Sequence, residues 1–399
     1  MVDEAAARAA AQAAADAVDP DEVVRFARAL IAAPSENPGG TEDAAATVAA
    51  DILSSLGAEV RTLRSHADRP SVMATLGTGE RPVLAWNGHL DVVPAGAPDT
   101  WSHSPWAGTI EARRLIGRGA ADMKGPIAAA LAAAAALQRA GADVAGTLAL
   151  HLVADEEMAG IHGTKVLWDQ GLLDQDACIV GEPTELRVAL AERGGTWITA
   201  TARGTAAHGS QPHLGVNAIT SMARFLLRLP EVLPDLEHPL VGRPTVNAAL
   251  ITGGSAPNVV PDRCEVDIDR RIVPGETDPD LVLAPFRRLA DALREEHPEV
   301  RIDTEIREWT DAAEAPTDSR IAQLARAAVA AQTGQDAADA GFTGITDARF
   351  YINQARIPTV ILGPGSLSVA HTANESIDVE ELIAGARVYA RIFASYLGA

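Results

Sequence analysis

The sequence has few cysteines, no long apolar segment and no leader of the secretory type. Its two cysteines, Cys178 and Cys264, lie in strand-like runs, so we interpret them as small buried residues rather than as a disulfide or a redox pair. The most apolar run spans residues 127–137, shorter than the roughly 18 residues of a membrane-spanning helix. The first 17 residues lack the basic start and apolar stretch of a secretory signal. These absences predict a cytoplasmic protein without a membrane partner.

Positive charge is also scarce. The chain has 33 Lys and Arg residues against 54 Asp and Glu residues, a formal net charge of −21, which repels the phosphate backbone of nucleic acids. The sequence contains no Gly-x-Ser-x-Gly elbow, no His-Glu-x-x-His helix and no phosphate loop ending in Gly-Lys-Ser or Gly-Lys-Thr. We therefore expect neither a nucleic-acid partner nor the chemistry that these motifs carry.

Most of the chain alternates short apolar runs with longer alanine-rich runs of helical period. This alternation is typical of an α/β fold in which helices flank a mostly parallel sheet. The length of 399 residues favours two domains over one. Strands are expected at residues 71–76, 83–87, 147–154, 177–180 and 359–362, and helices at residues 42–56, 127–140, 163–170 and 379–396.

The middle of the chain has a different rhythm. The expected order of elements there is β-α-β-β-α-β, the ferredoxin-like α+β arrangement. We place this inserted domain at residues 191–308, and one discontinuous larger domain at residues 1–190 and 309–399. The strands are expected at residues 196–203, 245–252, 263–273 and 300–308, and the helices at residues 217–229 and 281–296.

Acidic and histidine side chains follow the expected strands of the larger domain. The residues in question are His89, Asp122, Glu157, Glu182 and His371. Since ligands of open α/β sheets bind outside the carboxyl ends of the strands, we expect these five side chains to converge. Two imidazoles with three carboxylates suit divalent metal ions, zinc above all, and three close carboxylates repel one another without a cation.

At these residues the sequence resembles the family of dizinc deacylases and exopeptidases that includes acetylornithine deacetylase, succinyl-diaminopimelate desuccinylase, aminoacylases and glutamate carboxypeptidase. The resemblance implies a zinc-exopeptidase-like fold and two Zn²⁺ ions per chain, for which Co²⁺ or Mn²⁺ can substitute. His89 and Glu182 would hold one ion, Glu157 and His371 the other, and Asp122 would bridge them. The matching stretches are residues 87–94, 117–125, 155–157, 181–184 and 371–375.

The resemblance also implies catalytic roles beside the metal ligands. Asp91 would orient the imidazole of His89. Glu156 would be the general base, which takes a proton from a metal-activated water and delivers it to the leaving amine. A cis peptide bond is expected between Asp122 and Met123.

In relatives, the inserted domain is a lid and a dimerisation domain. By resemblance, His208 of one subunit would donate to the developing oxyanion in the partner's site, so a homodimer is expected. Asn258 and Arg270 would bind the carboxylate of the substrate. Arg193 and Thr346 match positions at which relatives contact substrate. The matching stretches of this domain are residues 204–213, 257–261 and 269–271.

The expected reaction is hydrolysis of the amide bond of an N-acyl amino acid, a small molecule with a free carboxylate. The enzyme would be of the deacetylase, desuccinylase or aminoacylase type, and the loop at residues 346–349 is closer to the desuccinylase and aminoacylase branch. A dipeptidase or a carboxypeptidase with the same two metal ions remains open. A non-catalytic ligand-binding relative is a weaker alternative, because such a protein would have lost Glu156, which is present here.

Overall fold

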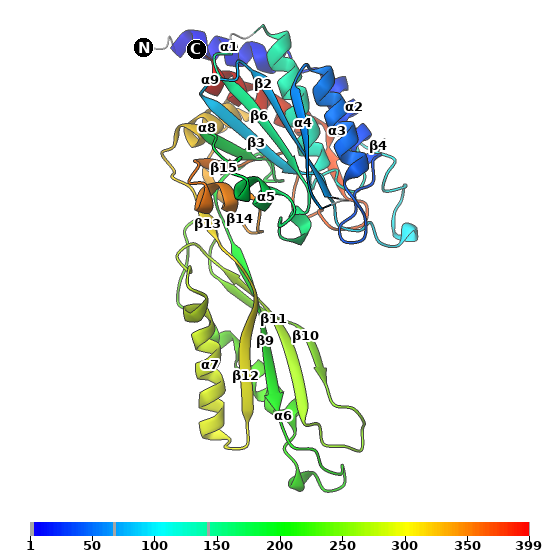
Figure 1. Ribbon diagram of the computed structural model, residues 1–399, viewed down its shortest axis with the longest axis vertical. Helices are drawn as coiled ribbons and strands as arrows, with labels where there is room; N and C mark the ends of the chain where they lie inside the picture. The colour runs from blue at the N-terminus through cyan, green and yellow to red at the C-terminus, as the bar shows by residue number, and fades with distance from the viewer. Residues whose placement is uncertain (1–3, 67–68, 142–143, 399) are drawn as a thin grey trace. The chain divides into compact units, whose positions relative to one another are not determined.

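The computed structural model describes residues 4–66, 69–141 and 144–398, and the chain forms two compact units (Figure 1). The larger unit comprises Met1–Leu190, Ala315–Phe342 and Thr346–Ala399, and the smaller unit comprises Ala191–Glu314 and Thr343–Ile345. The insertion extends beyond residue 308 because its last strand, β12, continues to Thr310. No helix within the described ranges combines the length and apolarity needed to cross a membrane.

The larger unit contains one large sheet, a small three-stranded sheet and helices. Its helices are α1 (Glu4–Asp16), α2 (Pro20–Ile31), α3 (Asp43–Ser55), α4 (Lys124–Arg139), α5 (Thr164–Asp169), α8 (Arg320–Thr333) and α9 (Val379–Leu397), with the short turns η1 (Pro98–Thr100), η2 (Glu156–Met158) and η5 (Phe350–Gln354). The small sheet has the order β16 (Ser376–Asp378), β5 (Arg114–Ile116), β4 (Thr109–Glu111).

Nine strands form the large sheet. Along the sheet they are β1 (Glu59–His66), β2 (Arg69–Gly77), β6 (Thr147–Val153), β3 (Val83–His89), β7 (Ala177–Val180), β15 (Thr359–Ile361), β8 (Val188–Glu192) and β13 (Ala313–Glu314), and β14 (Asp339–Phe342) also pairs with β8. The central strands β6, β3, β7 and β15 are parallel. The outer pairs β1–β2, β2–β6, β15–β8 and β8–β13 are antiparallel. The α/β class and the mostly parallel centre expected from the sequence are confirmed.

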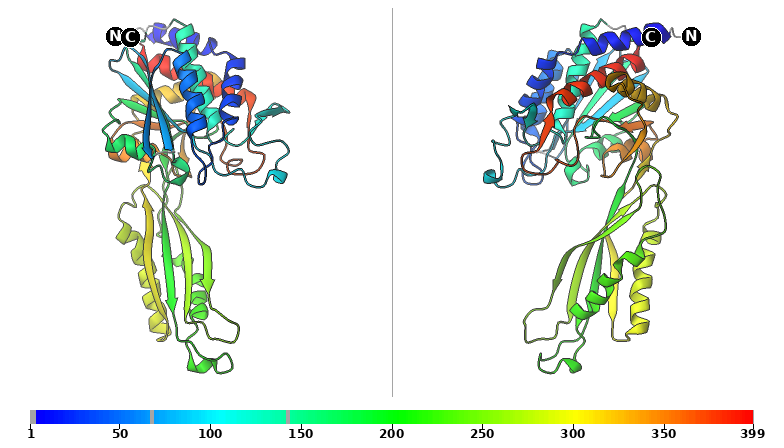
Figure 2. Two further views of the ribbon diagram at one scale, coloured as in Figure 1. Left: turned by 45° about the vertical axis from the view of Figure 1, so that its right-hand side comes forward. Right: turned by 180° about the vertical axis from the view of Figure 1, so that it is seen from behind.

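Both faces of the central strands are covered, and Figure 2 shows helices on both sides of the sheet. Trp86 of β3 packs edge-on against Tyr389 of α9, with ring centroids 5.7 Å apart. The next residue, Asn87, points to the other face, where its side-chain amide donates to Thr164 of α5 at 3.2 Å. Every residue of β6 and β7 is buried. Because both faces of the central strands are covered, polar side chains can gather at a ligand site at the strand ends rather than on the faces of the sheet.

The smaller unit has one antiparallel sheet and two helices. Its strands follow the order β10 (Thr245–Gly253), β11 (Arg263–Ile272), β9 (Gly194–Arg203), β12 (Arg301–Thr310). Its helices are α6 (Ala218–Leu227) and α7 (Pro279–Glu296), with the turns η3 (Pro212–Leu214) and η4 (Leu229–Val232). Phe225 and Phe286 of the helices share a core with Ile198 and Val266 of the sheet. The ferredoxin-like arrangement is thus present.

Candidate metal centre

Three neighbouring parallel strands end at the same level and deliver polar residues to one edge of the sheet. On β3, Asn87 lies opposite His151 of β6 and Val180 of β7. His89 is the last residue of β3 and pairs with Val153, the last residue of β6. Glu157 follows β6 and Glu182 follows β7 after short turns. The register of the three strands therefore brings the side chains of His89, Glu157 and Glu182 towards one another.

Asp122 reaches the same place from the loop that precedes α4. The peptide bond between Asp122 and Met123 is cis, as the resemblance predicts. One oxygen of Glu375 accepts hydrogen bonds from the backbone N–H groups of Ala121 at 2.9 Å and Asp122 at 3.0 Å. Its other oxygen pairs with Arg118 at 2.6 Å. Glu375 is an important residue that the sequence analysis did not single out, although it ends the matching stretch 371–375.

The five donors form two triads that share Asp122. On one side, Nε2 of His89 lies 3.0 Å from Oδ1 of Asp122 and 3.9 Å from Oε1 of Glu182. On the other side, Nε2 of His371 lies 3.5 Å from Oδ2 of Asp122 and 3.1 Å from Oε2 of Glu157. Within each triad the candidate ligand atoms all lie within 4.8 Å of one another. Asp122 thus turns a different oxygen to each triad.

This donor set fits two divalent cations. Imidazole nitrogens and carboxylate oxygens are the ligands of zinc and of related transition metals. Burial, reinforced by the charge of Asp122, raises the pKa of Glu182 well above its usual range. Hydrogen bonds to Asp122 and Glu157 raise the pKa of His371 to about 10. Without metal ions, the protein thus buries several acidic side chains close together, and their negative charge needs compensation by positive charge. Bound metal ions would supply that charge.

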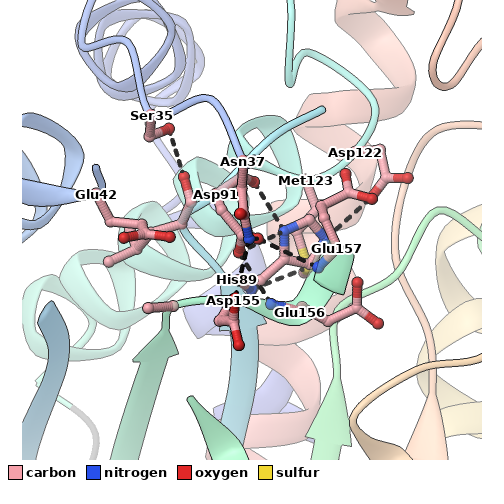
Figure 3. Close-up of polar contacts among 12 residues, drawn as sticks. Ser35, Asn37, Glu42, His89, Asp91, Asp122, Met123, Asp155, Glu156 and Glu157 are labelled. Atoms are coloured by element: carbon pink, nitrogen blue, oxygen red, sulfur yellow. Dashed lines mark hydrogen bonds and ion pairs between the residues drawn. The ribbon is translucent and has the colours of Figure 1, made fainter. Parts of the chain in front are cut away.

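The hydrogen bonding of His89 leaves its Nε2 atom available to bind a metal ion. Its Nδ1 lies 2.9 Å from the backbone oxygen of Asp91, an acceptor only, so Nδ1 carries the hydrogen of the neutral ring and Nε2 keeps its lone pair. The carboxylate of Asp91 is more distant from this nitrogen, at 3.6 Å. It accepts instead from the backbone N–H groups of Glu156 and Glu157, each at 3.2 Å (Figure 3). Asp91 therefore contacts His89 through its backbone and the 156–157 turn through its side chain.

Glu156 stands beside the donor cluster without belonging to either triad. It begins the turn η2 directly before the donor Glu157. Burial raises the pKa of Glu156 well above its usual range, against the lowering effect of a charged His89. A carboxyl group beside the donor Glu157 but outside both triads is placed to exchange a proton at this site without binding the ions.

In the smaller unit, the structure brings His208 and Asn258 together. Both are exposed, and the N–H of Gly209 donates to the backbone oxygen of Asn258 at 2.7 Å. A Cβ atom at position 209 would lie 3.0 Å from that backbone, so a larger residue would require the Asn258 backbone to shift. Nδ1 of His208 accepts from the N–H of Ser210 at 3.2 Å. Nε2 therefore carries the hydrogen of the neutral ring and is free to act as a donor.

Two adjacent arginines of β11 have opposite environments. Arg270 is 1% exposed, and its Nη2 donates to Glu276 at 2.5 Å. Arg271 points to the other face, with 37% of its side chain exposed. Its Nε and Nη2 donate to the two carboxylate oxygens of Asp269 at 2.8 and 3.0 Å. The guanidinium of Arg270 is engaged inside the unit, and the expectation that it binds a substrate carboxylate stays a prediction. The sequence analysis did not single out Arg271, which lies in the same 269–271 stretch.

The other two predicted substrate contacts lie in different units. Nη2 of Arg193, in the smaller unit, donates to the backbone oxygen of Val241 at 2.6 Å. Burial and the charge of nearby Arg271 lower the pKa of Arg193. Thr346, in the larger unit, is buried, and its hydroxyl accepts from the N–H of Ala348 at 2.9 Å. Arg193 is therefore grouped with Arg271, and Thr346 belongs to the loop beside the sheet.

Comparison with known proteins identifies the family. Residues 85–395 match the sequence profile of the family described as "Peptidase family M20/M25/M40". The chain belongs to this peptidase family. Among its relatives, the succinyl-diaminopimelate desuccinylase of Phenylobacterium zucineum is 31% identical, with 94% of this chain and 98% of that protein covered. A probable succinyl-diaminopimelate desuccinylase of Staphylococcus epidermidis is 28% identical, with coverage of 87% and 91%.

Solved structures of other peptidases share the fold. Aminopeptidase PepT from Bacillus cereus superposes with a TM-score of 0.78 at 22% identity, covering 95% of this chain and 99% of that chain. A dinuclear metal-binding peptidase of Bacillus subtilis gives a TM-score of 0.71 at 17% identity, with coverage of 95% and 98%. As a family member with desuccinylase relatives, the protein is a metal-dependent hydrolase that acts on amide bonds. The family and the enzyme class expected from the sequence are confirmed.

Proposed function

We propose that the protein hydrolyses the amide bond of an N-acyl amino acid with two Zn²⁺ ions per chain, for which Co²⁺ or Mn²⁺ can substitute. The observation that carries this proposal is the position of Asp122, whose two oxygens face two separate triads of donors. A shared carboxylate between two sets of ligands is the arrangement that two-metal hydrolases use. The five ligands would be His89, Asp122, Glu157, Glu182 and His371.

In this proposal the chain's own residues move the proton. Bound metal ions lower the pKa of a water molecule towards about 7 and polarise the substrate carbonyl. Glu156 accepts the proton from the attacking water, and Asp91 holds the backbone of Glu156 through its carboxylate. The same proton then passes to the amide nitrogen as the C–N bond breaks, so that a carboxylate and an amine are released. His208, whose Nε2 is a donor, would stabilise the oxyanion in the partner's site.

The free carboxylate of the substrate would be bound by the smaller unit. We assign this role to Arg271 and Arg193, together with Asn258, rather than to Arg270. Arg271 is 37% exposed at its side chain, so its guanidinium could exchange the ion pair with Asp269 for the substrate carboxylate, since a guanidinium fork matches a carboxylate with two parallel hydrogen bonds. Arg270 would support it from the opposite face of β11 through its ion pair with Glu276. Thr346 remains a proposed substrate contact from the larger unit.

A hydrolysis screen of the zinc- or cobalt-loaded protein tests the substrate class. The panel contains N-succinyl, N-acetyl and N-formyl amino acids beside dipeptides. Relatives named as succinyl-diaminopimelate desuccinylases favour an N-succinyl substrate. Turnover of peptides without turnover of N-acyl amino acids would select the dipeptidase or carboxypeptidase alternative. Binding without turnover of any amide would select the non-catalytic alternative.

We also propose a cytoplasmic homodimer that forms through the smaller unit. Strand β10 ends the strand order of its sheet and carries Leu250 and Ile251, which are 66% and 58% exposed. An exposed apolar edge strand of this kind is expected to be covered by pairing with a partner. Both cysteines are free and buried, which fits a reducing compartment. Sedimentation gives the oligomeric state, and recovery of activity on mixing His208→Ala with Glu156→Ala subunits would show that His208 acts across the dimer.

A further inference from the structure

The turn that carries Glu156 and Glu157 depends on bonds from elsewhere in the chain. It lies between Asp155 and Ala159, whose φ angles are 68° and 75°. Residues other than glycine seldom adopt this left-handed conformation, and it persists where surrounding contacts impose it. The position of both glutamates therefore depends on whatever fixes this turn.

Two carboxylates fix the turn. Asp91 accepts from the N–H groups of Glu156 and Glu157, each at 3.2 Å. Asp155 accepts at one oxygen from the N–H of His162, at 3.0 Å. Both carboxylates are buried, so their mutual repulsion is poorly screened. A donor must lie between them.

That donor is the side-chain amide of Asn37 (Figure 3). Its Nδ2 lies 2.9 Å from Oδ2 of Asp91 and 3.1 Å from Oδ1 of Asp155. An amide nitrogen carries two hydrogens, one for each carboxylate. Asn37 is 1% exposed, so no solvent competes for these bonds.

Arg69 sets the orientation of this amide. Its Nη2 donates to Oδ1 of Asn37 at 2.7 Å. Because a guanidinium is only a donor, the amide oxygen must face Arg69 and the amide nitrogen must face the two aspartates. Arg69 is held in turn by Glu42 at 2.7 Å, and it lies 3.5 Å from Asp155.

The backbone places Asn37 independently of these side chains. Its N–H donates to the oxygen of Val92 at 2.8 Å, and the N–H of Val92 donates to the oxygen of Ser35 at 3.0 Å. The hydroxyl of Ser35 adds a side-chain bond to the oxygen of Leu90 at 2.7 Å, on which these two backbone bonds do not depend. The segment 35–37 therefore runs beside the residues that follow β3, and Asn37 is presented to the 155–157 turn from a fixed support.

We propose that Asn37 is a positioning residue of the hydrolase, which sets the place of Glu156 by clamping Asp91 and Asp155 together behind the turn. The inference rests on the proposed role of Glu156 as general base. Asn37 touches neither the substrate nor the reacting atoms, and it acts through the two aspartates. A neutral side chain with two hydrogens on one atom is what this place requires. An aspartate of the same shape would add a third carboxylate and remove both donors.

The test compares Asn37→Asp with Ser35→Ala in the zinc-loaded enzyme, on whichever amide substrate the wild type turns over. Asn37→Asp should lower kcat by roughly 10–100-fold, the usual effect of losing an outer contact of a metal site, while KM and the content of two metals per chain stay unchanged. Ser35→Ala removes a buried hydrogen bond from the same segment and should keep the kcat of the wild type. If Asn37→Asp does not fold, Asn37→Ala is measured in the same way, since it removes the donor without adding charge.

Hydrogen–deuterium exchange of the metal-free protein provides a readout that needs no substrate. Asn37→Asp should speed exchange in the peptide that covers residues 155–162 several-fold, and Ser35→Ala should leave that peptide unchanged. Unchanged exchange and unchanged kcat in Asn37→Asp would overturn the proposal, as would equal losses in both variants or loss of metal as the cause of inactivity. A wild type that hydrolyses no N-acyl amino acid would count against the proposed substrate alone, because the exchange measurement would still decide the role of Asn37.

Discussion

The two triads of the candidate metal centre differ in how they are built. His89 ends β3 and Glu182 lies two residues after β7, and both are buried, with His89 only 1% exposed. His371 lies in a loop at a φ angle of 62°, with 52% of its side chain exposed, and Glu157 lies in the turn after β6. We call the first the closed triad and the second the open triad. The sheet positions His89 and Glu182, the donors that belong to the closed triad alone, whereas loops and outer hydrogen bonds position Glu157 and His371 of the open triad.

This difference predicts unequal affinities. A preformed, buried set of ligands loses little entropy on binding and should hold its metal more tightly than a set on loops. The open triad also includes Glu157, which directly follows Glu156 in the sequence. The weaker metal would therefore be the one next to the proposed base, and the predictions that follow test this contrast.

The largest effect is expected at the residue that the triads share. Asp122→Ala should abolish turnover and reduce bound zinc to well under one ion per chain, because each triad loses a ligand. Metal analysis after reconstitution measures this directly. Retention of one full equivalent of zinc would show that the closed triad does not need Asp122.

The next effect separates the neighbours Glu156 and Glu157. Glu156→Ala should lower kcat by roughly 10²–10⁴-fold with both metals bound, since a general base contributes that much without coordinating the ion. Glu157→Ala should lose one metal, that of the open triad. Equal metal loss in the two variants would mean that the division between base and ligand is wrong.

A smaller effect distinguishes the two histidines in the metal-free protein. His89→Ala leaves the buried oxygens of Asp122 and Glu182 without their partner and should lower the free energy of unfolding by about 3 kcal/mol. His371→Ala should cost less than His89→Ala, because its imidazole is half exposed although its partners Asp122 and Glu157 are buried. Chemical denaturation with a chelator present gives both values. Similar costs would remove the distinction between a closed and an open triad.

The smallest effect concerns His151, which is buried like His89 but faces no carboxylate. Nδ1 of His151 bonds to the hydroxyl of Tyr351 at 2.8 Å, and burial lowers its pKa from 6.5 to about 4. Between these values the unfolded chain binds more protons, so stability falls as the pH falls through 6.5. Between pH 7 and about 5.5, His151 should lower the free energy of unfolding by about 1 kcal/mol. In His151→Gln, the fall in the free energy of unfolding over this range should be smaller by that amount. An identical pH dependence in the variant would refute the assignment.

The sequence predicted best the parts of the molecule that local pattern determines. The strands that lead to His89 and Glu182 were placed to within two residues, because apolar runs that end in turn residues mark strand ends. Helices α1, α2 and α8 were not assigned. Alanine-rich composition hides the apolar stripe of α1 and α8, whereas α2 has an apolar stripe at Val23, Phe26 and Leu30 that was missed. The cis bond at Asp122 was predicted from the resemblance, and no local pattern indicates it.

What the sequence could not indicate are contacts between distant segments. Asn37 is separated from Asp91 by 54 residues and from Asp155 by 118 residues, and an asparagine in a loop predicts a turn rather than a clamp. Glu375 and Arg271 stood inside matching stretches, but only the packing shows which acid holds the Asp122 loop and which arginine is accessible. Pattern locates the donors, and the tertiary structure shows what supports them.

The place of the insertion in the chain has a consequence for biosynthesis. All three members of the closed triad precede the smaller unit, which begins at Ala191, whereas His371 follows it. A ribosome therefore completes the closed triad before it begins the smaller unit and supplies the last donor of the open triad only after that unit has been made. A chain interrupted within the insertion would retain all three ligands of the closed triad and lack one donor of the open triad, His371. With two ions bound as proposed, occupancy of the open triad would report that translation has passed through the whole insertion.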